Sequence, residues 1–398
     1  MKDIAIVMGR NYTSRLCMIR SAGLAGCSVV VIQTGRGVTS INPIDASSKY
    51  VIETHVVEEP NKEKLLSTIK KYTNYEGRKI LLPTDDYTAS VIDLSLDTLK
   101  GDFLMPHVDN TQGALVRIMN KKLQKKMAME VGLNVAEGWI AIFEDGEYHI
   151  PQGITYPCFT KPNESYKRPL KHLMKKCCNE QELISHLNEI SKVSHDTILI
   201  EQYIKIEKEY GILGVSIEEK VVIPAIILKT SNYHGVTATG VISPIDSKKD
   251  LREKLCQFIE KLNLTGLFDI DMYESNGILY FNELNLRFGA GGFAVVKAAI
   301  NLPQLFIEHF RGIDIKTNIA PVFAKQTFAS DKVCFEKFKA FHWSLSEYKK
   351  NINSVDFTFL NQEFDKGPYK EFEKENKTLI VYVRHFIKGI LRKVHLSH

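Results

Sequence analysis

Three apolar runs near the start of the chain have the length of single buried strands. They lie at residues 4–8, 28–32 and 79–83, and stretches with helical periodicity follow or separate them. Strands that alternate with helices predict a parallel α/β sheet, and such sheets bind ligands beyond the carboxyl ends of their strands. The polar turns Gly9–Asn11 and Thr84–Asp86 stand at two of these ends, where an ordinary turn and a binding loop are both open interpretations.

Two stretches in the middle of the chain place lysines in unusual settings. Residues 110–131 predict one long helix, and a solvated helix face is the ordinary explanation for the basic run Asn120–Lys126 inside it. Residues 156–162 have the pattern of a short strand with Lys161 inside it. Burying a lysine costs free energy unless an anion meets it, so this strand favours an anionic ligand.

The clearest local signal is a hairpin whose turn is Asn276–Gly277, a pair that favours two-residue turns. Its strands are expected at residues 268–273 and 278–286. Side chains alternate between the two faces of a strand, so Asp269 and Asp271 share one face of the first strand.

The returning strand of this hairpin has a polar face. Glu283, Asn285 and Arg287 share that face by alternation. We expect Phe281 on the same face and the leucines between these residues on the other. Pairing across the turn can bring Asp271 near Glu283 and Asn285. Carboxylate and amide oxygens suit Mg²⁺ shared with nucleotide phosphates, and the guanidinium of Arg287 can hold a phosphoryl group. A solvated polar face is the alternative.

Composition narrows the class of protein. The 398 residues predict roughly two to four domains, and 44% hydrophobic with 25% charged residues is typical of a globular chain. The net charge of +5 comes from residues 314–398 without a basic stripe, so we expect no nucleic-acid partner. The seven cysteines include no CxxC pair, which favours reduced thiols over a zinc site. No apolar run is long enough to span a bilayer, and we expect a soluble cytoplasmic protein.

The segment Gly289–Ala294 matches GxGxxA after a strand and before a helix, which is the context of a dinucleotide-binding loop. The strand before it carries charged and amide side chains, whereas a central parallel strand is apolar throughout. A nicotinamide-dependent oxidoreductase is therefore a less favoured alternative. The phosphate loop GxxxxGKS/T does not occur in the sequence.

The order of these parts resembles the ATP-grasp superfamily, and within it a single module of the carbamoyl-phosphate synthase large subunit. Asn282–Gly289 resembles the family's metal strand and is the most specific motif, and the resemblance covers residues 1–312. It implies an α/β fold of the α+β ATP-grasp type. We expect a Rossmann-like parallel-sheet domain, a two-lobed ATP-grasp domain and a small accessory region, with bounds 1–110, 111–312 (lobes 111–195 and 196–312) and 313–398.

The resemblance also implies a role for each candidate residue of the site. ATP and two Mg²⁺ ions are the implied cofactors, with Mn²⁺ as an alternative metal. Glu283 is expected to bridge both ions, while Asp271 and Asn285 complete one each. Arg287 and Asn285 are the expected catalytic residues. The implied nucleotide contacts are Lys121 and Lys161 for phosphate, the segment Glu201, Gln202, Tyr203 and Ile204 for adenine, and Glu209 for the ribose.

The same resemblance implies an ATP-dependent ligase. The γ-phosphoryl group of ATP passes to a substrate carboxylate, and an amine or a similar nucleophile attacks the acyl phosphate. The expected partners are a small-molecule carboxylate and a small-molecule amine. The sequence leaves their identities open, together with the oligomeric state. A sensor or scaffold that binds ATP without turnover is a further alternative.

Two departures from the family and one terminal segment complete the expectations. Asn120 stands where the family usually has aspartate. The loop 162–169 has no glycine, although the family usually closes a glycine-rich loop over the phosphates, so full activity is an open question. Residues 377–398 have a basic amphipathic pattern. We expect this segment to dock on the body of the protein, and contact with a membrane surface is the less favoured alternative.

Overall fold

The structure is a computed structural model that describes residues 2–377 apart from 145–146, 165, 167–173, 193–196, 219 and 315–322. Half of the glycine-free loop and all of the basic amphipathic segment except Lys377 therefore lie outside the described residues. Among the helices that are described, none is both long and apolar enough to cross a membrane.

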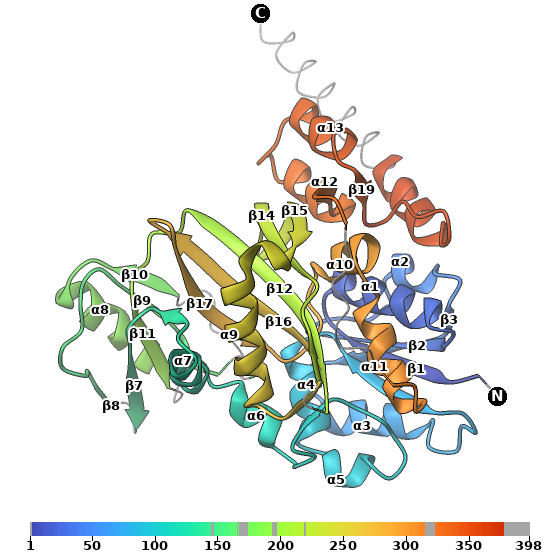
Figure 1. The fold of residues 1–398 in the computed structure, drawn as a ribbon, viewed down its shortest axis with the longest axis horizontal. Helices are drawn as coiled ribbons and strands as arrows, with labels where there is room; N and C mark the ends of the chain where they lie inside the picture. The colour runs from blue at the N-terminus through green and yellow to red at the C-terminus, as the bar shows by residue number, and fades with distance from the viewer. Residues whose placement is uncertain are drawn as a thin grey trace, which may run out of the picture.

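A four-stranded parallel sheet forms the N-terminal part, as predicted, with strand order β3-β2-β1-β4 (Figure 1). Its central strand is apolar throughout because it supplies two cores: Ile4 and Ile6 pack into one, Ala5 and Val7 into another. The elements of this part are β1 (Ile4–Gly9), α1 (Tyr12–Leu24), β2 (Ser28–Gly35), α2 (Pro43–Ala46), β3 (Val51–Glu58), α3 (Lys62–Lys70), β4 (Lys79–Pro83), α4 (Asp86–Asp93), α5 (Leu96–Leu99) and β5 (His107–Val108).

The single helix expected at residues 110–131 is wrong, because the chain forms two helices there, α6 (Ala114–Ile118) and α7 (Lys121–Glu130). Asn120 lies between them with an extended backbone, and its side chain accepts a hydrogen bond from the N–H of Leu123. An asparagine in that position begins a new helix because it satisfies a backbone donor of the first turn. The break sets the start of α7, and with it the direction of the lysines that follow.

A five-stranded antiparallel sheet comes next, in the order β10-β9-β11-β7-β8. Helix α8 covers one face of it, where Leu183 and Leu187 pack with Cys158 and Cys177. The other face is left for the site. The elements are β7 (Gly138–Glu144), β8 (Glu147–His149), β9 (Cys158–Pro162), β10 (Lys175–Cys177), α8 (Glu180–Ser191) and β11 (Ile198–Gln202).

The largest sheet runs through the centre of the molecule, with strand order β19-β18-β15-β14-β12-β16-β17-β6. Figure 1 shows it between the antiparallel lobe and the N-terminal sheet. Its elements are β6 (Asn134–Val135), β12 (Lys208–Ile217), β13 (Lys220–Val222), β14 (Ala225–Tyr233), β15 (Val236–Pro244), a 3-10 helix (Ile245–Lys248), α9 (Lys249–Glu260), β16 (Leu264–Ser275), β17 (Ile278–Asn285), α10 (Gly292–Ala298) and α11 (Leu302–Phe310).

The predicted hairpin is confirmed as β16 and β17. Asn276 and Gly277 both have positive φ, at 50° and 73°, as a tight two-residue turn requires. Asp271 lies directly opposite Glu283, but the register shifts between Asp271 and Met272, so β17 carries one extra residue there. A bulge of this kind reverses the alternation of faces. The expected position of Phe281 is therefore wrong: it packs into the core, 5.2 Å from the ring of Phe258.

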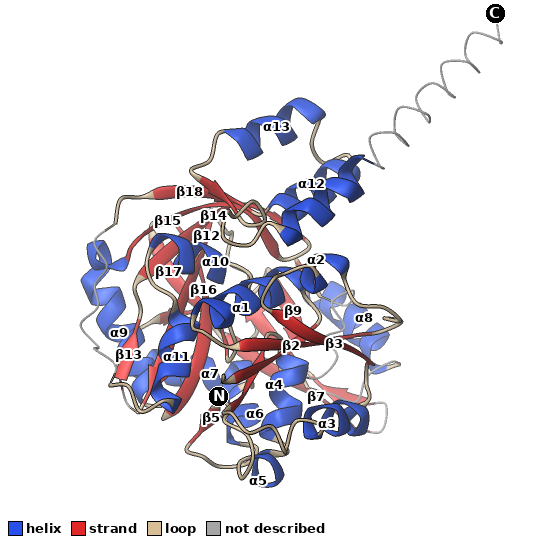
Figure 2. Cartoon of the chain, turned by 90° about the vertical axis from the view of Figure 1, so that its right-hand side faces the viewer, coloured by secondary structure: helices blue, strands red, loops and turns tan. Residues whose placement is uncertain are grey.

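The C-terminal region extends the large sheet and returns to the first helix. It contains β18 (Gln326–Ala329), α12 (Asp331–Lys339), α13 (Leu345–Asn353) and β19 (Phe357–Thr358), and β18 pairs with β15. Figure 2 shows α12 and α13 beyond the same end of the sheet as β14 and β15. Arg20 of α1 is buried and donates to the carboxylate of Asp365 at 2.9 Å and to the carbonyls of Phe359 and Leu360.

Candidate active site

A cavity of about 470 Å³ opens between the antiparallel lobe and the large sheet. The expected phosphate, adenine and ribose residues and two of the three expected metal ligands come from α7, β9, β11 and the residues after it, β12, β16 and β17. The fold brings them to this one space. Those that line it are Lys121, Lys161, Glu201, Gln202, Tyr203, Ile204, Glu209, Asp271 and Glu283.

The lysines of the cavity are paired with carboxylates. Lys121 Nζ lies 2.7 Å from Glu283 Oε2, which joins α7 to β17. Glu201 binds two cations at once, because its carboxylate oxygens lie 2.6 Å from Lys125 Nζ and 2.8 Å from Lys161 Nζ. The strand that was expected to bury a lysine does so, and the anion that meets Lys161 within the chain is Glu201.

Burial and these ion pairs act against each other on the pKa values of Lys161 and Glu283, and both pKa values end below their ordinary ones. Burial lowers the pKa of Lys161 to about 8, and the neighbouring Lys125 and Lys121 act in the same direction against Glu201. Burial opposes ionisation of Glu283, but Lys121 and Lys161 outweigh it and hold the pKa of Glu283 down at about 2. The site therefore keeps an ionised carboxylate beside a lysine that can lose its proton near neutral pH.

Two backbone N–H groups at the end of β11 and just after it already donate hydrogen bonds to carbonyl groups of the chain. The N–H of Gln202 donates to the carbonyl of Glu137 at 2.8 Å, and the N–H of Tyr203 donates to the carbonyl of Pro157 at 2.9 Å. Because these two N–H groups have acceptors, the expected adenine contact would be made by Ile204 and by backbone carbonyl groups of this connection. Glu209, on β12, accepts a hydrogen bond from the side chain of Asn232 on β14.

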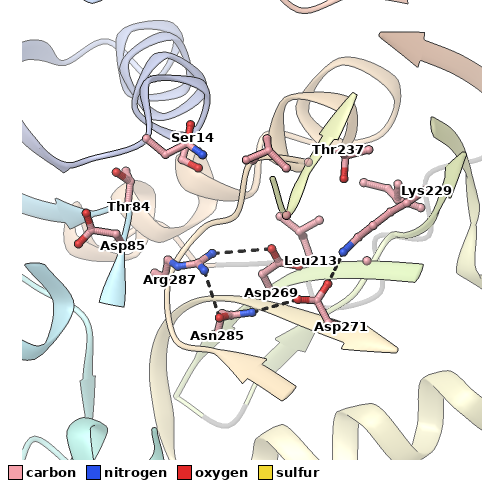
Figure 3. A pocket seen from close by; sticks show the side chains of 17 residues that line it. Ser14, Thr84, Asp85, Leu213, Lys229, Thr237, Asp269, Asp271, Asn285 and Arg287 are labelled. Atoms are coloured by element: carbon pink, nitrogen blue, oxygen red, sulfur yellow. Dashed lines mark hydrogen bonds and ion pairs between the residues drawn. The ribbon is translucent and has the colours of Figure 1, made fainter. Parts of the chain in front are cut away.

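A second cavity, of about 160 Å³, lies between the N-terminal sheet and the large sheet (Figure 3). Asn285 and Arg287 line this space. The turns at the carboxyl ends of β1 and β4 reach it through Asn11, Thr84 and Asp85, so these turns are cavity walls as well as connections. The two cavities share Asp271, Lys229 and Gly235.

Arg287 is fixed by three neighbours, and Figure 3 shows two of them, Asn285 and Asp269, at the second cavity. It donates to Asp86 Oδ1 at 3.1 Å and to Asn285 Oδ1 at 3.1 Å, and its guanidinium lies 3.9 Å from Asp269 Oδ2. Burial and the charge of Asp271 raise the pKa of Asp269 to about 7. Asn285 donates its amide to Asp271 at 3.4 Å, which places one expected metal ligand beside another.

Comparisons with known proteins agree with this architecture, although no family model matches the sequence. Over 229 residues the chain is 24% identical to the D-alanine–D-alanine ligase of Bacillus cytotoxicus, which covers 52% of this chain and 62% of that protein. The chain thus spans slightly under two thirds of that relative's length.

Solved structures match over a longer stretch. The L-amino acid ligase of Bacillus licheniformis has a TM-score of 0.60 at 14% identity, covering 82% of this chain and 78% of that one. The N5-carboxyaminoimidazole synthetase of Staphylococcus aureus has a TM-score of 0.61 at 15% identity, covering 86% of each chain. The chain has the ATP-grasp fold.

Four residues of the two cavities were not among the predicted site residues. Lys125 follows Lys121 by one helical turn, a spacing that could have placed both on one face of α7. Asn282 is the extra residue of the bulge, and its Oδ1 accepts from Lys161 Nζ at 2.9 Å. Asp269 shares a strand face with Asp271, which alternation indicates. The sequence around Lys229 has no pattern that indicates a site residue.

The residues present fit a divalent metal that is completed by a nucleotide. Within the described part of the chain, no three His, Cys, Asp or Glu side chains form a group that could hold a metal by themselves. Asp271 and Glu283 face each other across the ladder, and Asn285 is bonded to Asp271. Mg²⁺ typically takes one or two carboxylates and fills its remaining positions with phosphate oxygens and water.

The glycine at position 289, after β17, has a packing role. A β-carbon at position 289 would lie 1.7 Å from Asp269 Oδ2, so Gly289 lets the backbone pass close to that carboxylate. β17 is the return strand of a hairpin, antiparallel to β16, and its parallel partner among the described strands is the two-residue β6. A dinucleotide-binding loop instead follows a strand of a parallel βαβ unit. The GxGxxA match is thus accounted for without a nicotinamide cofactor.

Proposed function

We propose that the protein is an ATP-dependent ligase that activates a substrate carboxylate as an acyl phosphate and joins it to an amine, with release of ADP and phosphate. One observation carries the proposal: the cavity with the expected nucleotide residues meets a second cavity at Asp271, an expected metal ligand. A phosphoryl donor and its acceptor can therefore meet at one point between the lobes.

The proposed roles follow from charge. Lys121 and Lys161 bind phosphate oxygens, residues 201–204 and Glu209 hold the nucleoside, and Asp271, Glu283 and Asn285 hold Mg²⁺. Bound Mg²⁺ neutralises charge that develops on the transferred phosphoryl group. Arg287 donates to an oxygen of that group through its planar fork. A solved structure of the Staphylococcus aureus synthetase is a complex with ADP, which supports a nucleotide in this cavity.

The test is a phosphate-release screen of carboxylic acids crossed with amines, using the full chain, ATP and Mg²⁺. Mass spectrometry of each active pair must show the condensed product. We expect release only when acid and amine are both present, because the acyl phosphate needs a nucleophile. Glu283→Gln serves as the inactive control. Nucleotide binding without phosphate release in any pair would favour the sensor alternative instead.

The domain division is part of the same proposal. We propose the bounds 1–110, 111–312 and 313–398 for the three parts. Within the middle part, the expected change of lobe between 195 and 196 does not fit the strand pairing, because β11 (Ile198–Gln202) pairs with β7 and β9, so we place that change after Gln202. Limited proteolysis with and without ATP tests these bounds, because a nucleotide held between the antiparallel sheet and the large sheet should protect the connection at residues 203–207, which joins β11 to β12.

A further inference from the structure

Of the residues that line both cavities, two carry charges, and these two pair with each other. Lys229 Nζ lies 2.5 Å from Asp271 Oδ1, and both side chains are about four-fifths shielded from solvent. The third shared residue is Gly235, which has no side chain. Asp271 has a role in the proposed function, whereas Lys229 has none. Figure 3 shows Lys229 reaching from its strand toward Asp271 across the cavity.

The second cavity is rich in carboxylates. Asp85, Asp269 and Asp271 line it, and its described lining includes two cations, Lys229 and Arg287. Arg287 is already bound on several sides, by Asp86, Asn285 and Asp269. An anionic substrate therefore meets repulsion in this cavity unless a further cation is released for it, because an unpaired charge in a shielded site is costly. Lys229 becomes that cation if Asp271 is engaged elsewhere.

We propose that Lys229 binds the substrate carboxylate at the junction of the two cavities once Asp271 serves as a metal ligand. The inference rests on the proposed ligase function. Lys229 has two alternative anionic partners, Asp271 in the structure described here and the substrate in the loaded site. A carboxylate oxygen then attacks the γ-phosphorus, the bond to the bridging oxygen breaks, and its electron pair leaves with ADP. The ammonium group neutralises the carboxylate as it approaches the triphosphate.

A metal-binding measurement tests the exchange of partners without any turnover. Mn²⁺ binding to the full chain in the presence of ADP is followed by electron paramagnetic resonance for wild type, Lys229→Met and Lys229→Gln. In the wild type Mn²⁺ must displace the lysine from Asp271, so both variants should bind Mn²⁺ about tenfold more tightly. The matched control is Lys208→Met, which removes an ion pair with Glu274 on the same sheet, outside both cavities. Equal Mn²⁺ affinity in all four proteins overturns the inference.

Steady-state kinetics test whether the substrate carboxylate is the second partner of Lys229. They use an acid and amine pair taken from the phosphate-release screen. Lys229→Met should raise the KM for the carboxylate and lower kcat about tenfold or more, while the KM for ATP stays within about twofold. Lys229→Arg keeps the charge and should restore part of the loss. An active wild type with unchanged carboxylate kinetics in Lys229→Met refutes the substrate role and leaves the ligase function standing. A wild type that releases no phosphate refutes both, and the Mn²⁺ comparison still decides the pairing with Asp271.

Discussion

Lys121 Nζ lies 2.7 Å from Glu283 Oε2, so the lysine that we expect to bind phosphate is paired with the carboxylate that we expect to bind metal. Each group keeps the other ionised in a shielded place. A nucleotide–metal complex supplies both replacements together, an anion for the lysine and a cation for the carboxylate. The arrangement thus favours joint binding over either ligand alone.

Replacing Glu283 should remove activity and spare the fold. We expect Glu283→Gln to lower phosphate release about a hundredfold or more, because metal-ion stabilisation of a developing charge is worth several kcal/mol. Coupled release of phosphate measures the rate, and thermal melting checks the fold. Glu274→Gln, in the same hairpin but outside both cavities, is the control. Equal rates in Glu283→Gln and wild type would remove the metal assignment.

The two phosphate lysines should each contribute to nucleotide affinity. Charge-assisted hydrogen bonds contribute about 1.5–3 kcal/mol, so Lys121→Met and Lys161→Met should each weaken ATP binding about tenfold or more. Calorimetric titration with ATP and Mg²⁺ gives the affinity. Lys126→Met, an exposed position on the same helix, is the matched control. If both site variants bind as the control does, these lysines are structural only.

ATP affinity should fall as the pH rises through the pKa of Lys161. That pKa is about 8 in the free protein because of burial, and a bound phosphate favours the protonated form. The lysine is charged below pH 8 and must take up a proton on binding above it. The dissociation constant should therefore rise about tenfold between pH 7.5 and pH 9.

The control for this pH dependence is Lys161→Arg, whose guanidinium stays charged throughout the range. Its affinity should be nearly independent of pH over the same interval. Calorimetry in two buffers with different ionisation enthalpies detects the proton uptake directly in the wild type. The same pH profile in both proteins would assign the titration to a different group.

A side chain at position 289 should disturb the fold and the second cavity together. The β-carbon of Gly289→Ala would lie 1.7 Å from Asp269 Oδ2, so the backbone or the carboxylate has to move. We expect a loss of about 1–3 kcal/mol in the free energy of unfolding, the usual cost of overpacking. Chemical denaturation measures it. Gly101→Ala, where nothing lies within 4 Å of the added carbon, should unfold like the wild type.

The parts of the site that a sequence predicts are those set by local periodicity. The turn at Asn276–Gly277 fixed which residues of the two strands face each other, and Asp271 indeed lies opposite Glu283. The bulge at Asn282 was not predictable, because it depends on how two strands share a ladder rather than on either strand alone. It moved Phe281 into the core and brought an amide to Lys161.

Charged groups whose partners come from distant elements were the hardest to predict. The sequence predicted that Lys125 lies on a solvated helix face. Its partner Glu201 belongs to β11 of the antiparallel sheet. Lys229 lies in an ordinary strand, and its partner Asp271 is on another strand of the same sheet. Such pairs follow from the packing of elements against one another. The proposed roles of the described site residues stay predictions until they are measured.

The buried guanidinium of Arg20 links the beginning of the chain to its end. Its acceptors at Leu360 and Asp365 follow it by 340 and 345 residues. During synthesis the N-terminal sheet emerges first, but these acceptors reach the helix only after residue 365 has left the ribosome. Loss of one partner of a buried ion pair costs about 3–5 kcal/mol. The N-terminal sheet therefore acquires this buried ion pair only after residue 365 has been made, and a fragment that ends before residue 313 leaves Arg20 without these acceptors.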